Sequence, residues 1–328
     1  MKSNLLKGLM VAAIALATVS PAAAEKIRIA GNFPADHSSS LAMERFKEEV
    51  EKATNGGLEV DLFPAMQLGG AKENVDQMRS GALLMTWIGV AYLSRTVPEL
   101  EAVSLPFVFP NRESAFRVID GSVGKLLDQK LARKGIMSLG YMELGSRHVT
   151  NSVRPLKSAD DFKGLKIRLQ PNEVHLATFR AIGANPVSMG IEEVYPALQQ
   201  GVLDGHENPY SIIASRNLNE VQTYLSDTSH FFDLIIVAAN KSAYERLKPE
   251  HRTAIEAAMK NAISWQRQRA AEEDEKARET LIQRGMKFDP ISAELRTELR
   301  KRTEPVVTEL KRRIGDEVVD AVLKETAQ

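Results

Sequence analysis

The sequence contains no cysteine. Disulfide bonds, thiolate nucleophiles, and zinc or iron–sulfur sites built on cysteine are therefore excluded. Neither sign of charge dominates, because 43 lysines and arginines balance 43 aspartates and glutamates. A nucleic-acid-binding protein normally carries a basic excess on one face, so no nucleic-acid partner is expected. With only 20 glycines and 14 prolines, the composition also differs from that of collagen-like or low-complexity chains.

The common sequence signatures of catalysis are missing as well. The chain has no glycine-rich phosphate loop, no Gly-x-Ser-x-Gly turn and no His-Glu-x-x-His pair. Its six histidines are scattered, and none lies three or four residues from another, so no helix encodes a metal-binding pair. A catalytic or metal site would have to assemble from distant positions. The sequence gives no support for an enzyme, and we expect no metal and no cofactor.

One long apolar run stands at the start of the chain. It extends over residues 9–19, follows Lys2 and Lys7, and precedes three alanines that end at Ala24. This order is typical of a secretory signal peptide. Eleven helical residues cover about half of a bilayer's hydrocarbon thickness, although an uncleaved anchor is an alternative. We expect cleavage after Ala24, which leaves a soluble periplasmic protein of 304 residues with 41 cationic against 43 acidic side chains.

Short strand-like segments alternate with longer helix-like segments along the rest of the chain, which predicts an α/β protein. Helices are expected after the serines at 38–40, before Gly81, and over 173–182 and 191–200. Strands are expected near residues 27–29, 58–62, 83–88, 136–142, 165–169 and 234–238.

The length of the mature chain exceeds the usual size of one hydrophobic core, which favours two domains. No linker rich in proline, serine or glycine marks a boundary, so we expect the chain to cross between domains more than once. The predicted division is a signal peptide at 1–24, domain I at 25–145 plus about 234–272, and domain II at 146–233 plus about 273–328.

The segment between Pro249 and Gly285 has no internal proline or glycine and predicts a helix about 50 Å long. Such a helix could brace both domains. Its second half is mostly charged, so a solvated helix with i,i+4 pairs such as Glu272–Lys276 is the alternative.

Three polar residues suggest a site for an anion. Arg147 is expected just after the strand at 136–142, and Arg168 lies inside an apolar strand, where burying an arginine without a partner is unfavourable. A guanidinium binds carboxylate bidentately, and each charge-assisted bond contributes about 1.5–3 kcal/mol. A structural ion pair is the alternative for each arginine. Asn208 can donate and accept at once, but it is also typical of a turn before proline.

Several ordered motifs resemble the solute-binding proteins of TRAP transporters, the DctP family. They lie at residues 164–168, 182–187, 193–199 and 202–209, and earlier segments at 63–69, 105–109 and 161–164 agree. The resemblance implies two α/β domains with mixed sheets that close on a ligand, strands that form a hinge, and a long helix that spans both domains. It therefore favours the bracing role for the helix at 249–285.

The same resemblance implies which residues bind the ligand. Arg168 corresponds to the main carboxylate-binding arginine, Arg147 to a second one and Asn208 to the ligand amide. Asn32 matches a polar position near the first strand, and Glu73 matches an acidic one. Gly89 stands where relatives that bind sialic acid contact their ligand, with Tyr92 three residues further on, so sialic acid is not expected.

Further polar or aromatic residues favour a sugar acid, such as a hexuronate or aldonate, over a simpler acid. These are His37, Glu73, Asn172, Trp87 and His148. Each has a plainer interpretation: Glu73 in the first turn of a helix, Trp87 in the core, His37 in a loop. Two alternatives stay open: a binder of C4-dicarboxylates or other small carboxylates, and an enzyme acting on sugar acids with His37, Glu73 or His148 as acid or base. The expected partners are membrane subunits of a TRAP transporter, with a sensor kinase as an alternative, and the protein is expected to be a monomer.

Overall fold

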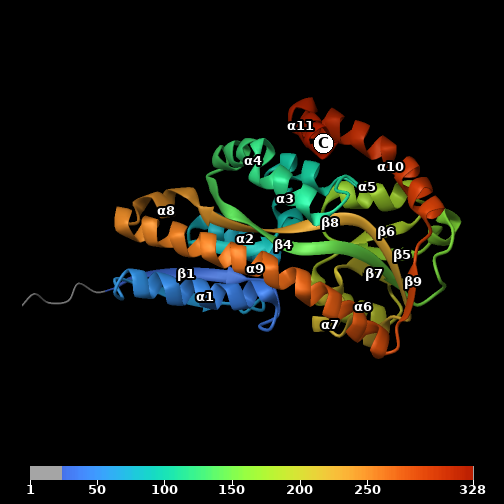
Figure 1. The fold of residues 1–328 in the computed structure, drawn as a ribbon, viewed down its shortest axis with the longest axis horizontal. Helices are drawn as coiled ribbons and strands as arrows, with labels where there is room; N and C mark the ends of the chain where they lie inside the picture. Colours follow the sequence, from blue (N-terminus) through green and yellow to red (C-terminus); the bar gives the residue numbers. More distant parts are fainter. Residues whose placement is uncertain (1–23, 328) are drawn as a thin grey trace, which may run out of the picture.

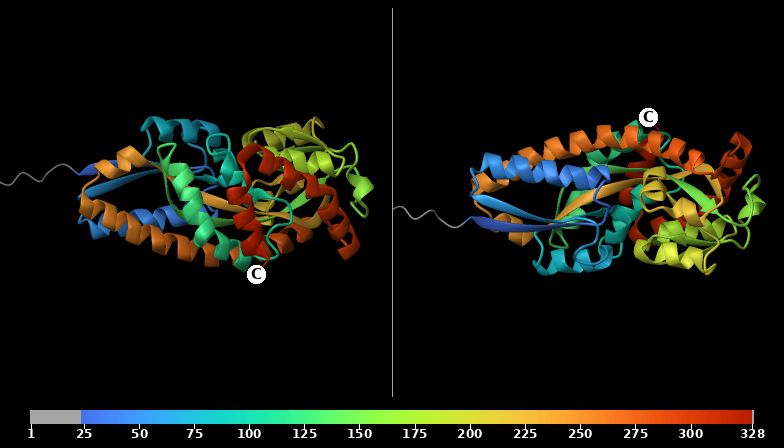
Figure 2. Two further views of the ribbon diagram at one scale, coloured as in Figure 1. Left: turned by 90° about the horizontal axis from the view of Figure 1, so that it is seen from above. Right: turned by 90° about the horizontal axis from the view of Figure 1, so that it is seen from below.

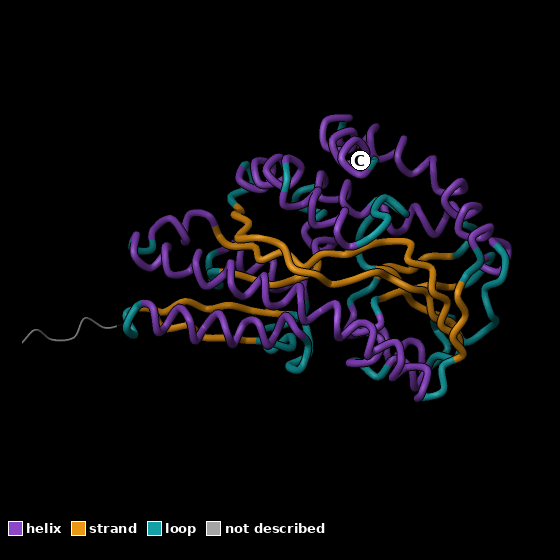
Figure 3. Tube along the Cα trace, viewed as in Figure 1, coloured by secondary structure: helices purple, strands orange, loops and turns teal. Residues whose placement is uncertain are grey.

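The computed structural model describes residues 24–327, so the predicted signal peptide, apart from Ala24, lies outside the described residues. The chain forms one curved mixed sheet with helices on both of its faces (Figures 1 and 3). Strand order in the sheet is β2-β1-β3-β8-β4-β7-β5-β6, with β9 paired to β8. Within residues 24–327, no helix is both long enough and apolar enough to cross a membrane.

The elements have the following bounds. The strands are β1 (Glu25–Gly31), β2 (Leu58–Phe63), β3 (Met85–Gly89), β4 (Ile136–Asn151), β5 (Lys166–Leu169), β6 (Asn185–Ser188), β7 (Gly205–Asn208), β8 (Tyr224–Asn240) and β9 (Lys287–Pro290). The helices are α1 (Ser38–Ala53), α2 (Ala71–Ser80), α3 (Arg112–Asp120), α4 (Ser122–Ala132), α5 (Glu173–Ala181), α6 (Val194–Gln199), α7 (Tyr210–Ser215), α8 (Lys241–Arg246), α9 (Pro249–Gln283), α10 (Ala293–Ile314) and α11 (Asp316–Thr326). Short 3-10 helices include η1 (Val90–Leu93) and η4 (Ile191–Glu193).

Two long strands join the two lobes of the molecule. The first lobe contains β1–β3 with α1–α4, and the second contains β5–β7 with α5–α7. β4 and β8 pair antiparallel from Ile136 opposite Asn240 to Asn151 opposite Tyr224. β3 pairs with the last part of β8, whereas β7 pairs with the last part of β4, so each long strand belongs to both lobes. Their ladder shifts register at three places between residues 138 and 149. Such irregularities bend a strand, and we call this stretch between the lobes the hinge.

Side chains that alternate along the strands build a core on each face of the sheet. In β8, Ile236 and Ala238 pack with residues of α2, α3 and α4, whereas Ile235 and Val237 pack with α1 and α9. The second lobe has the same arrangement. One cluster there includes residues of β5, α5 and α10, and the other includes residues of α6, α7 and α9. The four clusters enclose a sheet that is buried on both faces.

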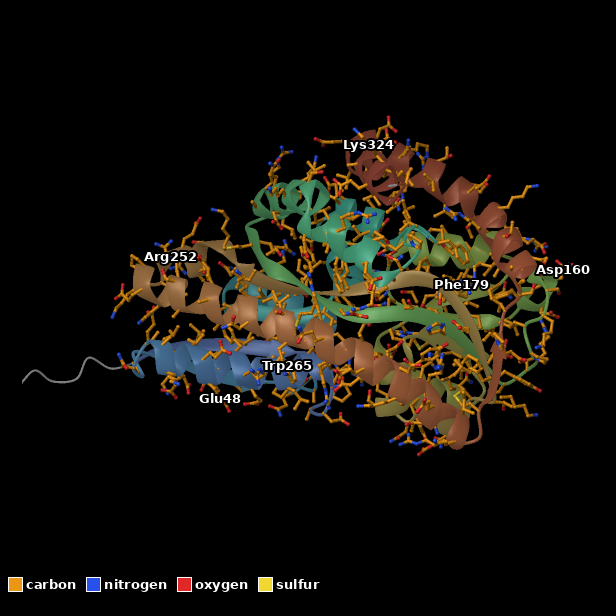
Figure 4. The ribbon with its side chains drawn as sticks, in the orientation of Figure 1. Glu48, Asp160, Phe179, Arg252, Trp265 and Lys324 are labelled. Atoms are coloured by element: carbon orange, nitrogen blue, oxygen red, sulfur yellow. The ribbon has the colours of Figure 1, made fainter. Side chains whose placement is uncertain are left out.

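Helix α9 confirms the predicted long helix and its bracing role. It spans 35 residues and contacts α1 in the first lobe and α7 in the second. Figure 2 shows this helix, in orange, running along most of the length of the molecule. Trp265 of α9 lies beside α1 (Figure 4), where the guanidinium of Arg45 stacks 5.0 Å from its ring. The Gln266 amide is buried and donates to the Glu143 carbonyl of β4 over 2.8 Å. The buried residues Ala277 and Leu281 exclude a wholly solvated second half.

The two long strands extend well beyond their predicted bounds. β4 reaches Asn151 rather than residue 142, and β8 begins at Tyr224 rather than residue 234. The prediction that Arg147 follows a strand is therefore wrong, because Arg147 lies inside β4. The added parts contain buried polar residues that bond to one another, so they lack the apolar pattern on which the prediction relied. The predicted domain boundaries stay a prediction, although α11, assigned to domain II, contacts α3 and α4.

Gly205 permits the close pairing of β7 with β4. It lies opposite Asn151, and a Cβ atom at this position would lie 2.0 Å from the carbonyl oxygen of Thr150. Because backbone atoms cannot move aside cheaply, Gly205→Ala should lower the free energy of unfolding by about 1–3 kcal/mol. Thermal denaturation followed by circular dichroism measures this effect. An unchanged melting temperature would contradict the pairing of Gly205 with Asn151.

Candidate functional site

A small cavity lies between the two lobes. Its volume is about 40 Å³, whereas sites for drug-sized ligands measure about 300–1,000 Å³. The lobes therefore lie close together in this structure, which we call the closed cleft, and they must lie further apart to hold a ligand that needs such a site. Both lobes and the hinge line the cavity, through Asn32, Phe33, Ala71, Gly89, Tyr92, Leu144, Arg147, Arg168, Gln170, Ile191, Asn208, Ile212 and Arg216.

Arg168 offers an uncommitted guanidinium to this cavity. The residue lies in β5 and is fully buried. Its Nε and Nη2 donate to the carbonyl of Met189 over 3.0 and 2.8 Å, and Nη2 also donates to the Tyr92 hydroxyl over 3.2 Å. Its Nη1 is buried and has no partner, and no carboxylate among residues 24–327 forms an ion pair with it. A buried cation in this state favours binding of an anion.

Arg147, in contrast, is neutralised by the protein itself. Its guanidinium donates to Glu207 through Nε and Nη2, the latter over 2.7 Å, and to Asp233 through Nη1 over 3.0 Å. All three side chains are buried. Burial alone would raise the pKa of Glu207, but the charge and hydrogen bonds of Arg147 hold that pKa below its usual value. Arg147 lines the cavity while forming the structural ion pair that the sequence left open as an alternative.

Amide side chains add neutral hydrogen-bonding groups to the cavity. Asn208, at the end of β7, accepts from Arg147 Nη2 over 3.1 Å. Asn32, just after β1, donates to Asn74 Oδ1 over 3.2 Å, and its own Oδ1 is buried without a partner. Gln170 donates to an oxygen of Asp233 over 2.7 Å. These groups can bond hydroxyls of a ligand as donors or acceptors.

The sequence analysis missed the apolar residues of the cavity lining and two polar ones, Gln170 and Arg216. Arg216 follows α7 within the polar sequence Ser215-Arg216-Asn217, which resembles an ordinary exposed helix end. The structure instead directs its Nη2 to the carbonyl of Asn32 over 2.8 Å, and its Nε is buried without a partner. Burial lowers the pKa of Arg216, and the nearby charge of Arg168 lowers it further. No signal in the sequence separates this arginine from a solvated one.

Three of the predicted ligand residues lie outside the cavity lining. Glu73 is exposed in the first turn of α2, where the helix dipole favours an acid. Trp87 is fully buried in the core. His148 stacks on Tyr210 with ring centres 3.8 Å apart, and its Nδ1 lies 2.9 Å from Asp227. Burial lowers the pKa of His148.

Two further predicted ligand residues, His37 and Asn172, cap helices instead of lining the cavity. The Nδ1 of His37 accepts from the backbone of Ser39 at the start of α1 over 3.2 Å, and its ring stacks on Phe33. Burial lowers the pKa of His37 to about 3, so its ring is neutral at neutral pH. Asn172 accepts from the backbone of His175 at the start of α5 over 3.0 Å. None of His37, Glu73 and His148, the acid–base candidates of the enzyme alternative, lines the cavity.

Comparisons with known proteins agree with this geometry. The family model DctP, described as bacterial extracellular solute-binding protein, family 7, matches residues 29–313. The 2,3-diketo-L-gulonate-binding periplasmic protein YiaO of Escherichia coli is 30% identical over 98% of this chain and 94% of its own. The C4-dicarboxylate-binding periplasmic protein DctP of Rhodobacter capsulatus is 35% identical over 96% of each chain.

A solved structure shows the same fold. The sugar acid binding protein DctPAm of Advenella mimigardefordensis, in complex with galactonate, superposes with a TM-score of 0.90 at 32% identity, covering 93% of this chain and 98% of its own. The family match spans nearly all of the described chain, and the solved relative is a ligand receptor with this two-lobed architecture. The resemblance predicted from the motifs is thereby confirmed, and the chain belongs to the DctP family, the solute-binding proteins of TRAP transporters, rather than to a family of enzymes.

Proposed function

We propose that this protein binds a sugar acid, an aldonate or a hexuronate, between its two lobes and delivers it to the membrane subunits of a TRAP transporter. It acts as a monomer in the periplasm after removal of residues 1–24. The observation that supports the ligand class is the buried guanidinium of Arg168, whose Nη1 faces no acceptor in the protein. A ligand carboxylate supplies the missing acceptor together with the missing negative charge.

The charges around the cavity favour a ligand with one negative charge. Three arginines line it, Arg147, Arg168 and Arg216, and two carboxylates, Glu207 and Asp233, bond to Arg147. With both acids ionised, this group carries one positive charge in excess; burial raises the pKa of Asp233, and the charge of Arg147 opposes that rise. An aldonate or hexuronate balances that excess with its single carboxylate, whereas a dicarboxylate leaves one negative charge over. Buried charges are stable only when they are paired, so this balance supports the monoanion.

The remaining cavity groups suit the hydroxyls of a sugar acid. Asn32 Oδ1 is a buried acceptor without a partner, and a ligand hydroxyl can donate to it. Asn208 and Gln170 present amides from the second lobe. A simple acid without hydroxyls would leave the acceptor of Asn32 unsatisfied, which is unfavourable in a closed cleft. The amides therefore support a hydroxylated ligand.

Binding is coupled to closure because the ligand contacts both lobes. Arg168 of the second lobe donates to Tyr92 of the first, and Arg216 of the second lobe donates to the carbonyl of Asn32 of the first. Both contacts join the two lobes, so separation of the lobes must break them. An empty closed cleft buries unpaired cations, so the open form is favoured until an anion binds. The membrane subunits can then distinguish the loaded form by its closed shape.

A thermal-shift screen tests the proposal. Galactonate, galacturonate and glucuronate are compared with succinate, a keto acid and an amino acid. At least one sugar acid should raise the melting temperature, because a ligand at about a thousand times its Kd contributes about 4 kcal/mol to stability. The absence of a shift with any sugar acid would contradict the proposed ligand class.

A C4-dicarboxylate is the second candidate. It is favoured by the 35% identity to the C4-dicarboxylate-binding protein of Rhodobacter capsulatus. A shift with succinate alone would establish this candidate and reject the sugar acid, while the family assignment would stand.

A further inference from the structure

Arg216 occupies an unusual position for an arginine at a helix end. It directly follows α7, the short helix after Asn208 and Pro209, and α7 is held against the long helix α9. Its half-buried side chain lines the same cavity as that of Arg168. Arg216 therefore contributes to the site from the end of α7, which supplies none of the ligand residues implied by the sequence motifs.

One nitrogen of Arg216 bridges the two lobes. Nη2 donates to the carbonyl oxygen of Asn32 over 2.8 Å, which connects the end of α7 to the segment after β1. Asn32 itself lines the cavity and has the unpartnered Oδ1. The bridge thus joins two cavity residues of opposite lobes at the point where a ligand would lie.

This bridge leaves most of the guanidinium unused. Nε of Arg216 is buried and has no hydrogen-bond partner, and no carboxylate among residues 24–327 forms an ion pair with the side chain. A residue that only held the lobes together would need a single donor, and a neutral amide could supply it. A buried, charged and unsatisfied donor instead requires an acceptor that arrives with the ligand.

We infer that Arg216 is a specificity-determining residue that binds the anionic ligand together with Arg168 and closes the cleft over it through Asn32. This inference rests on the proposed function. The ligand presents an oxygen to Nε of Arg216 while its carboxylate engages Nη1 of Arg168. One guanidinium comes from β5 and the other from the end of α7, so an acid is selected only if its oxygens reach both.

Isothermal titration calorimetry with galactonate, galacturonate, glucuronate and succinate tests this inference on the mature protein. The glutamine side chain ends near the position of Nε in arginine, so Arg216→Gln removes the charge, the planar guanidinium and the hydrogen bond to the Asn32 carbonyl. It should weaken binding of the preferred acid by about 10- to 100-fold, the value of one charge-assisted hydrogen bond. Arg216→Lys should lie between this variant and the wild type. Arg246→Gln, at an exposed arginine of α8 that bonds Ser242, is the matched control and should bind as the wild type does.

The outcomes separate the inference from the proposed function. The melting temperature of the ligand-free Arg216→Gln variant should stay within about 2 °C of the wild type, since the single hydrogen bond that it loses contributes only about 1 kcal/mol. Wild-type affinity in Arg216→Gln would overturn the inference, while loss of binding in Arg168→Gln would still support the proposed function. Loss in Arg216→Gln with full binding in Arg168→Gln would support Arg216 and overturn the role of Arg168. A wild-type protein that binds none of the four acids would overturn both.

Discussion

Replacing Arg168 with glutamine should abolish high-affinity binding of the ligand, with a loss of at least about 100-fold. The variant removes the only fully buried cavity guanidinium that no carboxylate of the described chain neutralises. The two N–H groups of the unpartnered Nη1 can donate two charge-assisted hydrogen bonds to ligand oxygens, each contributing about 1.5–3 kcal/mol, and about 1.4 kcal/mol corresponds to a tenfold change in Kd. Isothermal titration calorimetry with the preferred acid measures the effect.

The fold should tolerate this change, because Arg168 bonds only to the Met189 carbonyl and the Tyr92 hydroxyl and leaves no acid unpaired when it is removed. Arg180→Gln, at an exposed arginine in the last turn of α5, is the control in the same lobe and should leave both affinity and melting temperature unchanged. Unaltered affinity in Arg168→Gln would remove the main support for the proposed site.

Replacing Arg147 with methionine should chiefly lower the stability of the protein, whereas Arg168→Gln should chiefly lower its affinity for the ligand. Its removal leaves Glu207 and Asp233 buried without a cation. Breaking a buried ion pair by removing one partner costs about 3–5 kcal/mol. For a chain of this size that corresponds to a fall in melting temperature of about 5–8 °C, measurable by differential scanning calorimetry without ligand.

A surface arginine supplies the comparison for this variant. Arg302 pairs with Asp160 and Glu298 at the surface, where Figure 4 labels Asp160, and Arg302→Gln should change stability by less than about 1 kcal/mol. If Arg147→Met melted like the wild type and instead lost ligand affinity, Arg147 would be primarily a ligand residue, as the family resemblance implies, and its ion pairs would be secondary.

The sequence was most informative where a single physical pattern dominates. The helix at 249–285 was predicted within two residues of α9, because Pro249 can begin a helix and Gly285 favours its end. Arg168 was conspicuous because a charge inside an apolar strand demands an explanation. Four residues tied to the family motifs, Asn32, Arg147, Arg168 and Asn208, do line the cavity.

The sequence was least informative where polar side chains are buried by pairing with one another. The first half of β8 includes Ser226, Thr228, His230 and Asp233, all buried, and hydropathy alone cannot recognise it as a strand. Arg216 escaped notice for a related reason. Its position in the cavity depends on a contact with Asn32, 184 positions earlier. The residues next to Arg216 in the sequence give no information about a contact with so distant a residue.

Three elements, β4, β8 and α9, belong to both lobes, and this affects how the lobes separate and how the protein unfolds. β4, β8 and α9 each contribute to cores in both lobes, so neither lobe corresponds to a continuous stretch of chain. A fragment ending between the lobes would lack strands that its own sheet needs, and it could not fold as an independent unit. Opening and closing must therefore occur by bending of a hydrogen-bonded ribbon, and global unfolding must involve both lobes at once. The lobe motion that releases the ligand and the global unfolding of the protein therefore both involve β4, β8 and α9.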